Sequence, residues 1–216
     1  MINAKEVIAK RVAKELKDGD YVNLGIGIPA LVANYIPEGI EVFLQSENGI
    51  IGLGPNADES NIDLDLTNPS GQYATIKEYG MFFDTATSFM MIRGGHIDVT
   101  VLGTLEVDEE GSLASWIIPN KLVPGMGGSM DLVTGSKKVI IATTHMNKDQ
   151  TKIKKKCSLP LTGYKKVDLI VTEMAVMEVR DDGLYLIERH PDVSIEEIIQ
   201  STEATLKYDK VKVMEV

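Results

Sequence analysis

A strand–helix–strand pattern near the N-terminus restricts the fold more than any other feature of this sequence. Residues 21–24 are a candidate for a short strand that ends at the turn Gly25-Ile26-Gly27. Pro29 then suits the first turn of a helix that reaches about residue 35, and residues 40–44 are the candidate for a second strand. This β-α-β order favours a parallel sheet with right-handed crossovers.

The rest of the chain extends the same pattern. A helix is expected at 3–17 with Asn3 as its cap, another at 82–93, and a last one that opens at the capping-box pattern Ser194-Ile195-Glu196-Glu197. Further strands are expected at 99–102, 139–143, 167–172 and 184–187, and loops at 56–73 and 116–128. A length of 216 residues suits one domain and is short for two. We therefore predict one α/β domain over residues 1–216, with a mainly parallel open sheet flanked by helices.

Composition disfavours several classes of protein. A net charge of −10 is unlike that of a nucleic-acid binder, and no run approaches the roughly 18 apolar residues of a membrane span. The first twenty residues carry charges on every turn, unlike a secretory signal, and Cys157 is the only cysteine. These features fit a cytoplasmic protein. His96, His145 and His190 lack metal-ligand spacing, so no metal is predicted.

The segment Ser46-Glu47-Asn48-Gly49 is the first candidate for chemistry. Glu47 follows a predicted strand, and ligands of open α/β sheets bind outside the carboxyl ends of strands. The glycines that follow can let the backbone approach a ligand and present its N–H groups. A carboxylate at such a place can act as a nucleophile or a base, or can simply cap a turn. We predict that Glu47 is functional and that Ser46, Asn48 and Gly49 line its substrate pocket.

A dinucleotide site is a competing interpretation. The run Gly25-Ile26-Gly27-Ile28-Pro29-Ala30 matches G-x-G-x-x-G/A, and Glu47 falls where the ribose-binding acid is expected. However, the ribose-binding acid needs no glycine-rich loop after it, whereas Glu47 is followed by one, with glycines at 49, 52 and 54. A typical dehydrogenase also needs a catalytic domain, for which the chain leaves little room.

Five blocks of the sequence occur in a fixed order and together span nearly the whole chain. They are VNLGIGIP at 22–29, SENGIIGLGP at 46–55, MIRGGHIDVTVLGTLEVDEEGSLASW at 91–116, VPGMGGSMDLVTGSKKVIIATTH at 123–145 and KKCSLPLTG at 155–163. These blocks resemble the beta subunits of class I coenzyme A transferases, which include the acetoacetate, butyrate and 3-oxoacid CoA transferases. The run SENGIIGLGP resembles the active-site signature of that family.

The resemblance implies a fold shared with some sugar-phosphate isomerases and a ping-pong transfer of CoA through a glutamyl-CoA thioester on Glu47. Coenzyme A would be a co-substrate, with no tightly bound cofactor. Backbone N–H groups of Asn23 and Gly128 would stabilise the oxyanion, and Gly25, Gly27 and Gly127 would help to form the oxyanion and CoA site. The family also implies an alpha subunit, an alpha2beta2 heterotetramer, and short-chain or 3-oxo acids as substrates.

Three departures from the family pattern leave the acid specificity open. The chain has Asn68-Pro69-Ser70-Gly71 where the family commonly has Asn-Ala-Gly-Gly, Ser115 where it has Asn, and Asn120 where it has Gly. Two alternatives to CoA transfer remain at this point. One is a sugar-phosphate isomerase-like enzyme that uses Glu47 as a base without a partner, and the other is a non-catalytic ligand-binding module.

Overall fold

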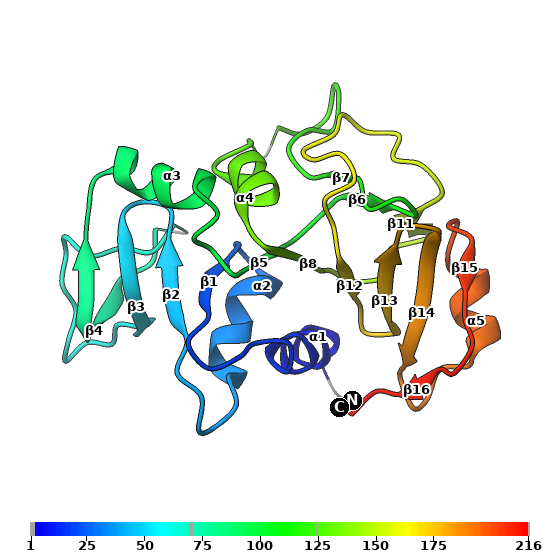
Figure 1. The fold of residues 1–216 in the computed structure, drawn as a ribbon, viewed down its shortest axis with the longest axis horizontal. Helices are drawn as coiled ribbons and strands as arrows, with labels where there is room; N and C mark the ends of the chain where they lie inside the picture. The colour runs from blue at the N-terminus through cyan, green and yellow to red at the C-terminus, as the bar shows by residue number, and fades with distance from the viewer. Residues whose placement is uncertain (1–2, 70, 124, 216) are drawn as a thin grey trace.

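The computed structural model of the protein describes residues 3–69, 71–123 and 125–215. An 11-stranded sheet crosses this described part in the order β15-β14-β13-β12-β8-β5-β1-β2-β3-β4, with β16 beside β14 (Figure 1). Its centre consists of mutually parallel neighbours, namely β12 (Leu169–Val171), β8 (Lys138–Ala142), β5 (Val99–Leu102), β1 (Tyr21–Leu24) and β2 (Phe43–Ser46). The parallel pairing of β1 with β2 confirms the predicted β-α-β unit.

Antiparallel strands extend the sheet at both sides of this parallel centre. On one side lie β3 (Ile50–Asn56) and β4 (Ala74–Phe82), and on the other lie β13 (Ala175–Arg180) and β14 (Gly183–Arg189). The short strands β15 (Leu206–Lys207) and β16 (Lys212–Val213) pair with β14 in parallel. The predicted mainly parallel sheet is therefore confirmed at its centre, whereas its antiparallel flanks were not predicted.

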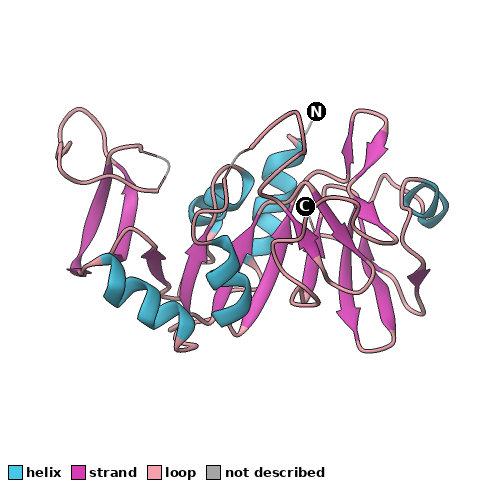
Figure 2. Ribbon diagram, turned by 90° about the horizontal axis from the view of Figure 1, so that it is seen from above, coloured by secondary structure: helices cyan, strands magenta, loops and turns pink. Residues whose placement is uncertain are grey.

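Helices cover both faces of the sheet (Figures 1 and 2). The helix α1 (Ala4–Ala13) packs with α2 (Ile28–Leu31) and the 3-10 helix η1 (Val32–Tyr35) on one face. The helices α3 (Thr85–Arg93) and α4 (Ser129–Gly135) pack together on the other face, and α5 (Ile195–Gln200) lies beside β15. The predicted Asn3 cap and Ser194 capping box are both present. Among the helices of the described residues, none is both long and apolar enough to span a membrane.

The core has one cluster of buried side chains on each face of the sheet. In β8, Val139 and Ile141 belong to the cluster that contains Leu132 of α4, whereas Ile140 and Ala142 belong to the cluster that contains Ile8 of α1. Central parallel strands are buried on both faces, so they read as continuous apolar runs rather than alternating ones. This explains why the strands expected at 99–102 and 139–143 were recognisable in the sequence, the second within one residue of its observed bounds.

Smaller strands lie outside the main sheet. The strands β6 (Glu106–Asp108), β7 (Leu113–Ala114) and β11 (Ile153–Lys154) form a three-stranded sheet, and β9 (Met146–Asn147) pairs with β10 (Gln150–Thr151).

The parallel strands at the centre of the main sheet all end at the same edge. That edge carries the Gly25 turn after β1, Glu47 after β2 and Gly103 after β5.

Candidate active site

Glu47 lies in a tight turn that joins β2 to the antiparallel strand β3. Gly49 closes this turn with a φ of 111°, and its N–H donates to the carbonyl of Ser46 over 3.0 Å. A Cβ on Gly49 would lie 2.0 Å from the carbonyl oxygen of Phe83. The turn therefore needs a residue without a side chain at this position.

The glycines that follow Glu47 serve the strands rather than a ligand. We predicted a glycine-rich loop here, but residues 50–56 form β3, which pairs with β4 through an irregular register. A Cβ on Gly52 would lie 2.8 Å from Gly80 Cα, and one on Gly54 would lie 2.3 Å from Thr75 Oγ1. The prediction is wrong in this respect, because the glycines allow β3 and β4 to approach closely at their bulges.

Gly128 is the direct partner of Glu47. Its N–H donates to Glu47 Oε1 over 3.3 Å, and it forms the N-cap of α4 with a φ of −84°. Any L-residue can adopt this φ, but a Cβ on Gly128 would lie 2.3 Å from Glu47 Oε2. A side chain at 128 would therefore have to displace the Glu47 carboxylate, whereas the backbone conformation itself does not call for glycine. The neighbouring Gly127 does have a positive φ, of 51°.

A cavity of about 440 Å³ lies beside the Glu47 carboxylate. Its wall comes from the ends of two parallel strands and from the loop before α4, at residues 23–26, 102–105 and 125–129, together with Glu47, Pro69, Ser115 and Leu132. The predicted Asn23, Gly25, Gly127 and Gly128 thus gather around Glu47. Thr104 and Met126 were not singled out from the sequence, because neither residue type signals a site on its own.

A second cavity of about 710 Å³ shares residues 24–26 and Pro69 with the first. Gly27, predicted for the oxyanion and CoA site, and Ser46, predicted for the substrate pocket, both line this second cavity. Asn48 and Gly49 line neither cavity. The Asn48 amide instead donates to the carbonyl of Thr67 over 2.9 Å and connects the turn to the 56–73 loop.

The backbone amide of Asn23 is placed differently from that of Gly128. Asn23 pairs with Thr100 of β5, and the N–H of Gly25, two residues on, donates to the Val101 carbonyl over 2.8 Å. Alternate residues of a strand direct their N–H groups to the same neighbour, so the Asn23 amide also faces β5. The backbone N–H groups of Asn23 and Gly25 are therefore both directed at the neighbouring strand of the sheet. Gly128 remains as the predicted donor whose N–H reaches Glu47.

The family departures fall at different distances from the site. Pro69 and Ser115 line the cavity beside Glu47, and the Ser115 hydroxyl lies 2.8 Å from Thr162 Oγ1. Asn120 lies in a surface turn with a φ of 62° and lines neither cavity, while Ser70 lies outside the described residues. Positions 69 and 115 are therefore the departures that lie in the wall of the cavity beside Glu47.

The dinucleotide interpretation fits this geometry poorly. The fingerprint requires a helix that begins at the glycine turn and directs its first N–H groups at a pyrophosphate. Here α2 covers only Ile28–Leu31 before the chain tightens into a 3-10 helix. The Gly25 N–H is already bonded within the sheet.

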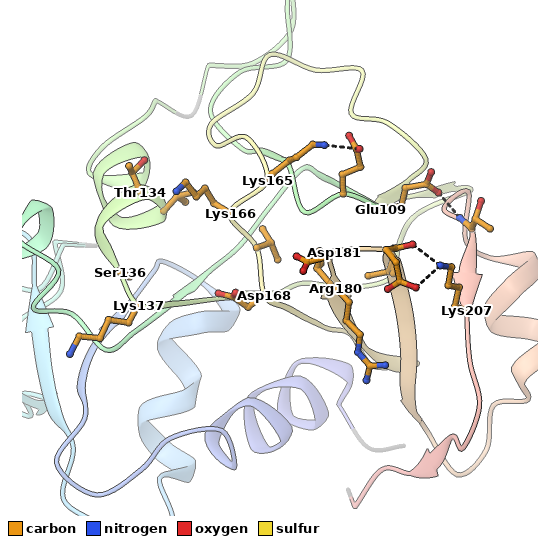
Figure 3. Close-up of a pocket in the computed structure, with 18 residues that line it drawn as sticks. Glu109, Thr134, Ser136, Lys137, Lys165, Lys166, Asp168, Arg180, Asp181 and Lys207 are labelled. Carbon is orange, nitrogen blue, oxygen red and sulfur yellow. Dashed lines mark hydrogen bonds and ion pairs between the residues drawn. The ribbon is translucent and has the colours of Figure 1, made fainter.

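A larger cavity, of about 760 Å³, lies away from Glu47 (Figure 3). Residues just before β8 and β12, such as Lys137 and Asp168, line it, so it belongs to the opposite edge of the parallel sheet. Charged side chains at its rim pair with each other. Lys165 Nζ lies 2.8 Å from a Glu110 carboxylate oxygen, and Lys207 Nζ lies 2.8 Å from one of Asp182.

Cys157 is a poor nucleophile in this structure. Burial raises the pKa of its thiol, and the carboxylates of Asp108 and Glu106 raise it further. The Sγ atom donates to the Ser112 carbonyl over 3.4 Å. Because the thiolate is the reactive form, a raised pKa agrees with a packed thiol.

Comparisons with known proteins show the family of the chain. The family model for coenzyme A transferases matches residues 5–201. The chain is 54% identical over 204 residues to the beta subunit of an acetate CoA-transferase of Haemophilus influenzae, and the match covers 94% of this chain and 91% of that protein. It is 49% identical over 205 residues to one subunit of a probable succinyl-CoA:3-ketoacid coenzyme A transferase of Bacillus subtilis, with 94% and 95% covered.

Solved structures with the same fold include an acyl-CoA transferase from Escherichia coli O157:H7. The apoenzyme has a TM-score of 0.81 and 24% sequence identity, and the match covers all of this chain but only 44% of that longer one. A second crystal structure of that protein is described as a thioester complex with CoA. From the family match and the identity to these relatives, the chain belongs to the coenzyme A transferase family.

Proposed function

We propose that this chain carries the nucleophile of a CoA transferase that exchanges CoA between an acyl-CoA and a free carboxylic acid. The observation that carries this proposal is the Glu47 carboxylate, held at the carboxyl edge of the sheet with Oε1 3.3 Å from the Gly128 nitrogen and with a cavity beside it. The names of the relatives as acetate and succinyl-CoA:3-ketoacid transferases support it.

The first half-reaction begins with attack of a Glu47 carboxylate oxygen on the thioester carbonyl of the donor. The tetrahedral intermediate collapses to a mixed anhydride between Glu47 and the acyl group, and CoA leaves as its thiolate. The thiolate then attacks the Glu47 carbonyl of the anhydride. The donor acid departs as a carboxylate, and a glutamyl-CoA thioester remains.

The second half-reaction reverses these steps with a different acid. The acceptor carboxylate attacks the glutamyl thioester, which gives a new mixed anhydride and CoA thiolate. The thiolate attacks the acceptor's acyl carbonyl, so that a new acyl-CoA leaves and the Glu47 carboxylate is restored. Every bond broken is replaced by one formed, and no ATP or metal is consumed.

A glutamate suits this chemistry because its carboxylate is ionised at neutral pH without a base. Its weakness as a nucleophile has to be offset by positioning and by stabilisation of the oxyanion. The Gly128 N–H is well placed for the second task, because in a glutamyl thioester one Glu47 oxygen is the carbonyl oxygen. Attack on that carbonyl puts negative charge on an atom already within reach of the N–H.

An alpha subunit forms part of this proposal. The Haemophilus influenzae relative is named as a beta subunit, and the Bacillus subtilis relative as one subunit of its transferase. The acyl-CoA transferase of the same fold is a longer chain, of which this one covers 44%. We place the alpha subunit against the 56–73 and 119–128 loops, in an alpha2beta2 enzyme of the cytoplasm. Acetoacetyl-CoA as donor and acetate or butyrate as acceptor are the substrates to test first.

Co-expression with a CoA-transferase alpha subunit tests the proposal. The purified complex should form acetyl-CoA from acetoacetyl-CoA and acetate, and CoA exchange should be lost with Glu47→Gln. Turnover of a sugar phosphate by the chain alone, with no CoA exchange by the complex, would support the isomerase alternative instead.

A further inference from the structure

Three buried polar side chains connect β1, β2 and α3 next to the active site. The Asn23 amide donates to Gln45 Oε1 over 2.6 Å, and the Gln45 amide donates to Ser88 Oγ over 3.0 Å. Asn23 and Gln45 are each 3% exposed, and Ser88 is fully buried. Gln45 lies on β2, two residues before Glu47 in the turn that follows this strand. The amide of Gln45 therefore joins α3 to the strand that leads to Glu47.

The helix α3 is in turn joined to the segment that carries Gly128. Phe89 follows Ser88, and its Cζ would lie 3.3 Å from a Cβ on Gly128. At the end of α3, Arg93 Nε donates to Asp131 Oδ1 over 2.7 Å, and Asp131 lies in the first turn of α4. The two helices lie side by side on one face of the sheet (Figure 1). A closed series of contacts thus runs from Glu47 through β2, α3 and α4 to Gly128.

We propose that Gln45, Ser88 and Asn23 are positioning residues that fix the distance between the Glu47 carboxylate and the Gly128 N–H. This inference rests on the proposed role of Glu47 as nucleophile. The Arg93–Asp131 pair contributes little rigidity, because the Arg93 side chain is 67% exposed and such surface pairs are weak. The Gln45–Ser88 hydrogen bond is buried, and a buried amide without a partner costs free energy. This bond therefore favours a single relative position of β2 and α3.

Removal of this bond should slow the reaction more than it weakens binding. Gln45→Met keeps the length of the side chain and removes its amide, and Ser88→Ala removes the hydroxyl at the other end. A displacement of the nucleophile by about 1 Å costs roughly a hundredfold in rate. In the complex with the alpha subunit, we expect each variant to lower kcat by about ten- to a hundredfold with little change in KM for acyl-CoA. The double variant should lose little more than Gln45→Met alone, because Gln45→Met already breaks the bond to Ser88 and also removes the acceptor of the Asn23 amide.

Thr100 provides the matched control. It is fully buried, it pairs with Asn23 in the neighbouring strand, and its Oγ1 lacks a hydrogen-bond partner among the described residues. Thr100→Val changes a buried polar side chain on the adjacent strand without breaking the Gln45–Ser88 bond. Its kcat should stay within about twofold of that of the parent enzyme.

The decisive measurement is the rate of glutamyl-CoA formation in a single turnover, taken with the melting temperature of each complex. A rate that falls in Gln45→Met and Ser88→Ala, beyond any loss of folded protein, supports the inference. Unchanged rates in both variants, while Glu47→Gln is inactive, would show that the network is only structural and leave the proposed function intact. Transfer that does not depend on Glu47 would overturn both.

Discussion

The N–H of Gly128 donates to Glu47 Oε1 over 3.3 Å, although 81 positions separate the two residues in the chain. The contact joins the turn of a β-hairpin to the first turn of α4, so neither segment can form it alone. It brings a carboxylate that can attack a thioester next to a backbone donor that can stabilise the oxyanion formed when the glutamyl carbonyl is itself attacked. Changes to either residue should therefore affect turnover before they affect the fold.

Substitution of Glu47 should remove turnover without removing the fold. Glu47→Gln keeps the shape but not the anionic nucleophile, so activity should be nearly absent. Glu47→Asp shortens the reach by one methylene, and we expect a loss of roughly a hundredfold. Steady-state CoA exchange by the co-purified complex measures both effects. Full activity of freshly prepared Glu47→Gln, with deamidation excluded by mass spectrometry, would refute the covalent role.

Gly128→Ala should damage catalysis while the complex still assembles. The backbone φ of −84° accepts alanine, but the new methyl group would lie 2.3 Å from Glu47 Oε2 and must displace the carboxylate. Loss of one oxyanion donor costs about 10²–10³ in rate, and Gly128→Val should be at least as impaired. Turnover, subunit assembly and melting temperature should be measured on one preparation. Turnover that falls only in proportion to assembly would make Gly128 a purely structural residue.

A double-mutant cycle shows whether the methyl group at 128 acts through Glu47. In a Glu47→Ala background the colliding carboxylate is absent, so Gly128→Ala should destabilise the complex less than it does when Glu47 is present. Urea denaturation measures the loss of stability that Gly128→Ala causes in each of the two backgrounds. Equal costs in the two backgrounds would mean that the methyl group collides with something else, such as Phe89.

Gly49→Ala should destabilise the protein strongly. It combines a positive φ with a Cβ only 2.0 Å from the Phe83 carbonyl oxygen, and we expect a loss of about 3 kcal/mol or more in the free energy of unfolding. Gly39→Ala is the control, since Gly39 has a similar positive φ of 86° and open space around it. Its cost should be about 1–2 kcal/mol. Equal losses would show that Phe83 does not constrain the turn.

His145 should make stability fall in weak acid. The ring is fully buried between Thr172 Oγ1 and Thr202 Oγ1, each 3.0 Å away, and burial lowers its pKa to about 4. The unfolded state, with a pKa of about 6.5, therefore takes up the proton first as the pH falls. Stability should be complete above about pH 6.5 and should drop by up to about 3 kcal/mol towards pH 4.

His145→Gln removes this titration, so the slope of stability between pH 6.5 and 4 should become shallower. His96→Gln is the control because His96 is exposed. Denaturation midpoints across the pH range measure the slopes. An unchanged slope in His145→Gln would assign the acid sensitivity to other groups.

Buried parallel strands were predictable from the sequence, whereas edge and surface elements were not. The strand 99–102 was located correctly because both of its faces are buried, so every residue is apolar or small. The edge strand β4 was missed because most of its side chains are exposed and it carries Lys77 and Glu78. The short helix α4 was missed because it follows a glycine-rich loop and spans only seven residues.

A residue of the candidate site was predictable when the residues next to it in the chain indicate a site. Glu47 follows a strand at the ligand-binding edge, and the resemblance indicated both Glu47 and Gly128. The Gln45–Ser88 bond joins residues 43 positions apart, and in the sequence both read as ordinary polar residues within a strand and a helix. The amide of Asn23 could be assessed only once its pairing with β5 was known.

Chemical trapping of the intermediate tests the covalent role of Glu47. The complex is incubated with acetoacetyl-CoA and then treated with hydroxylamine or borohydride, and its peptides are analysed by mass spectrometry. We predict a modification on Glu47 that depends on acyl-CoA and is absent from Glu47→Gln. Modification of Cys157 instead, or an unmodified Glu47 in fully active enzyme, would contradict this role.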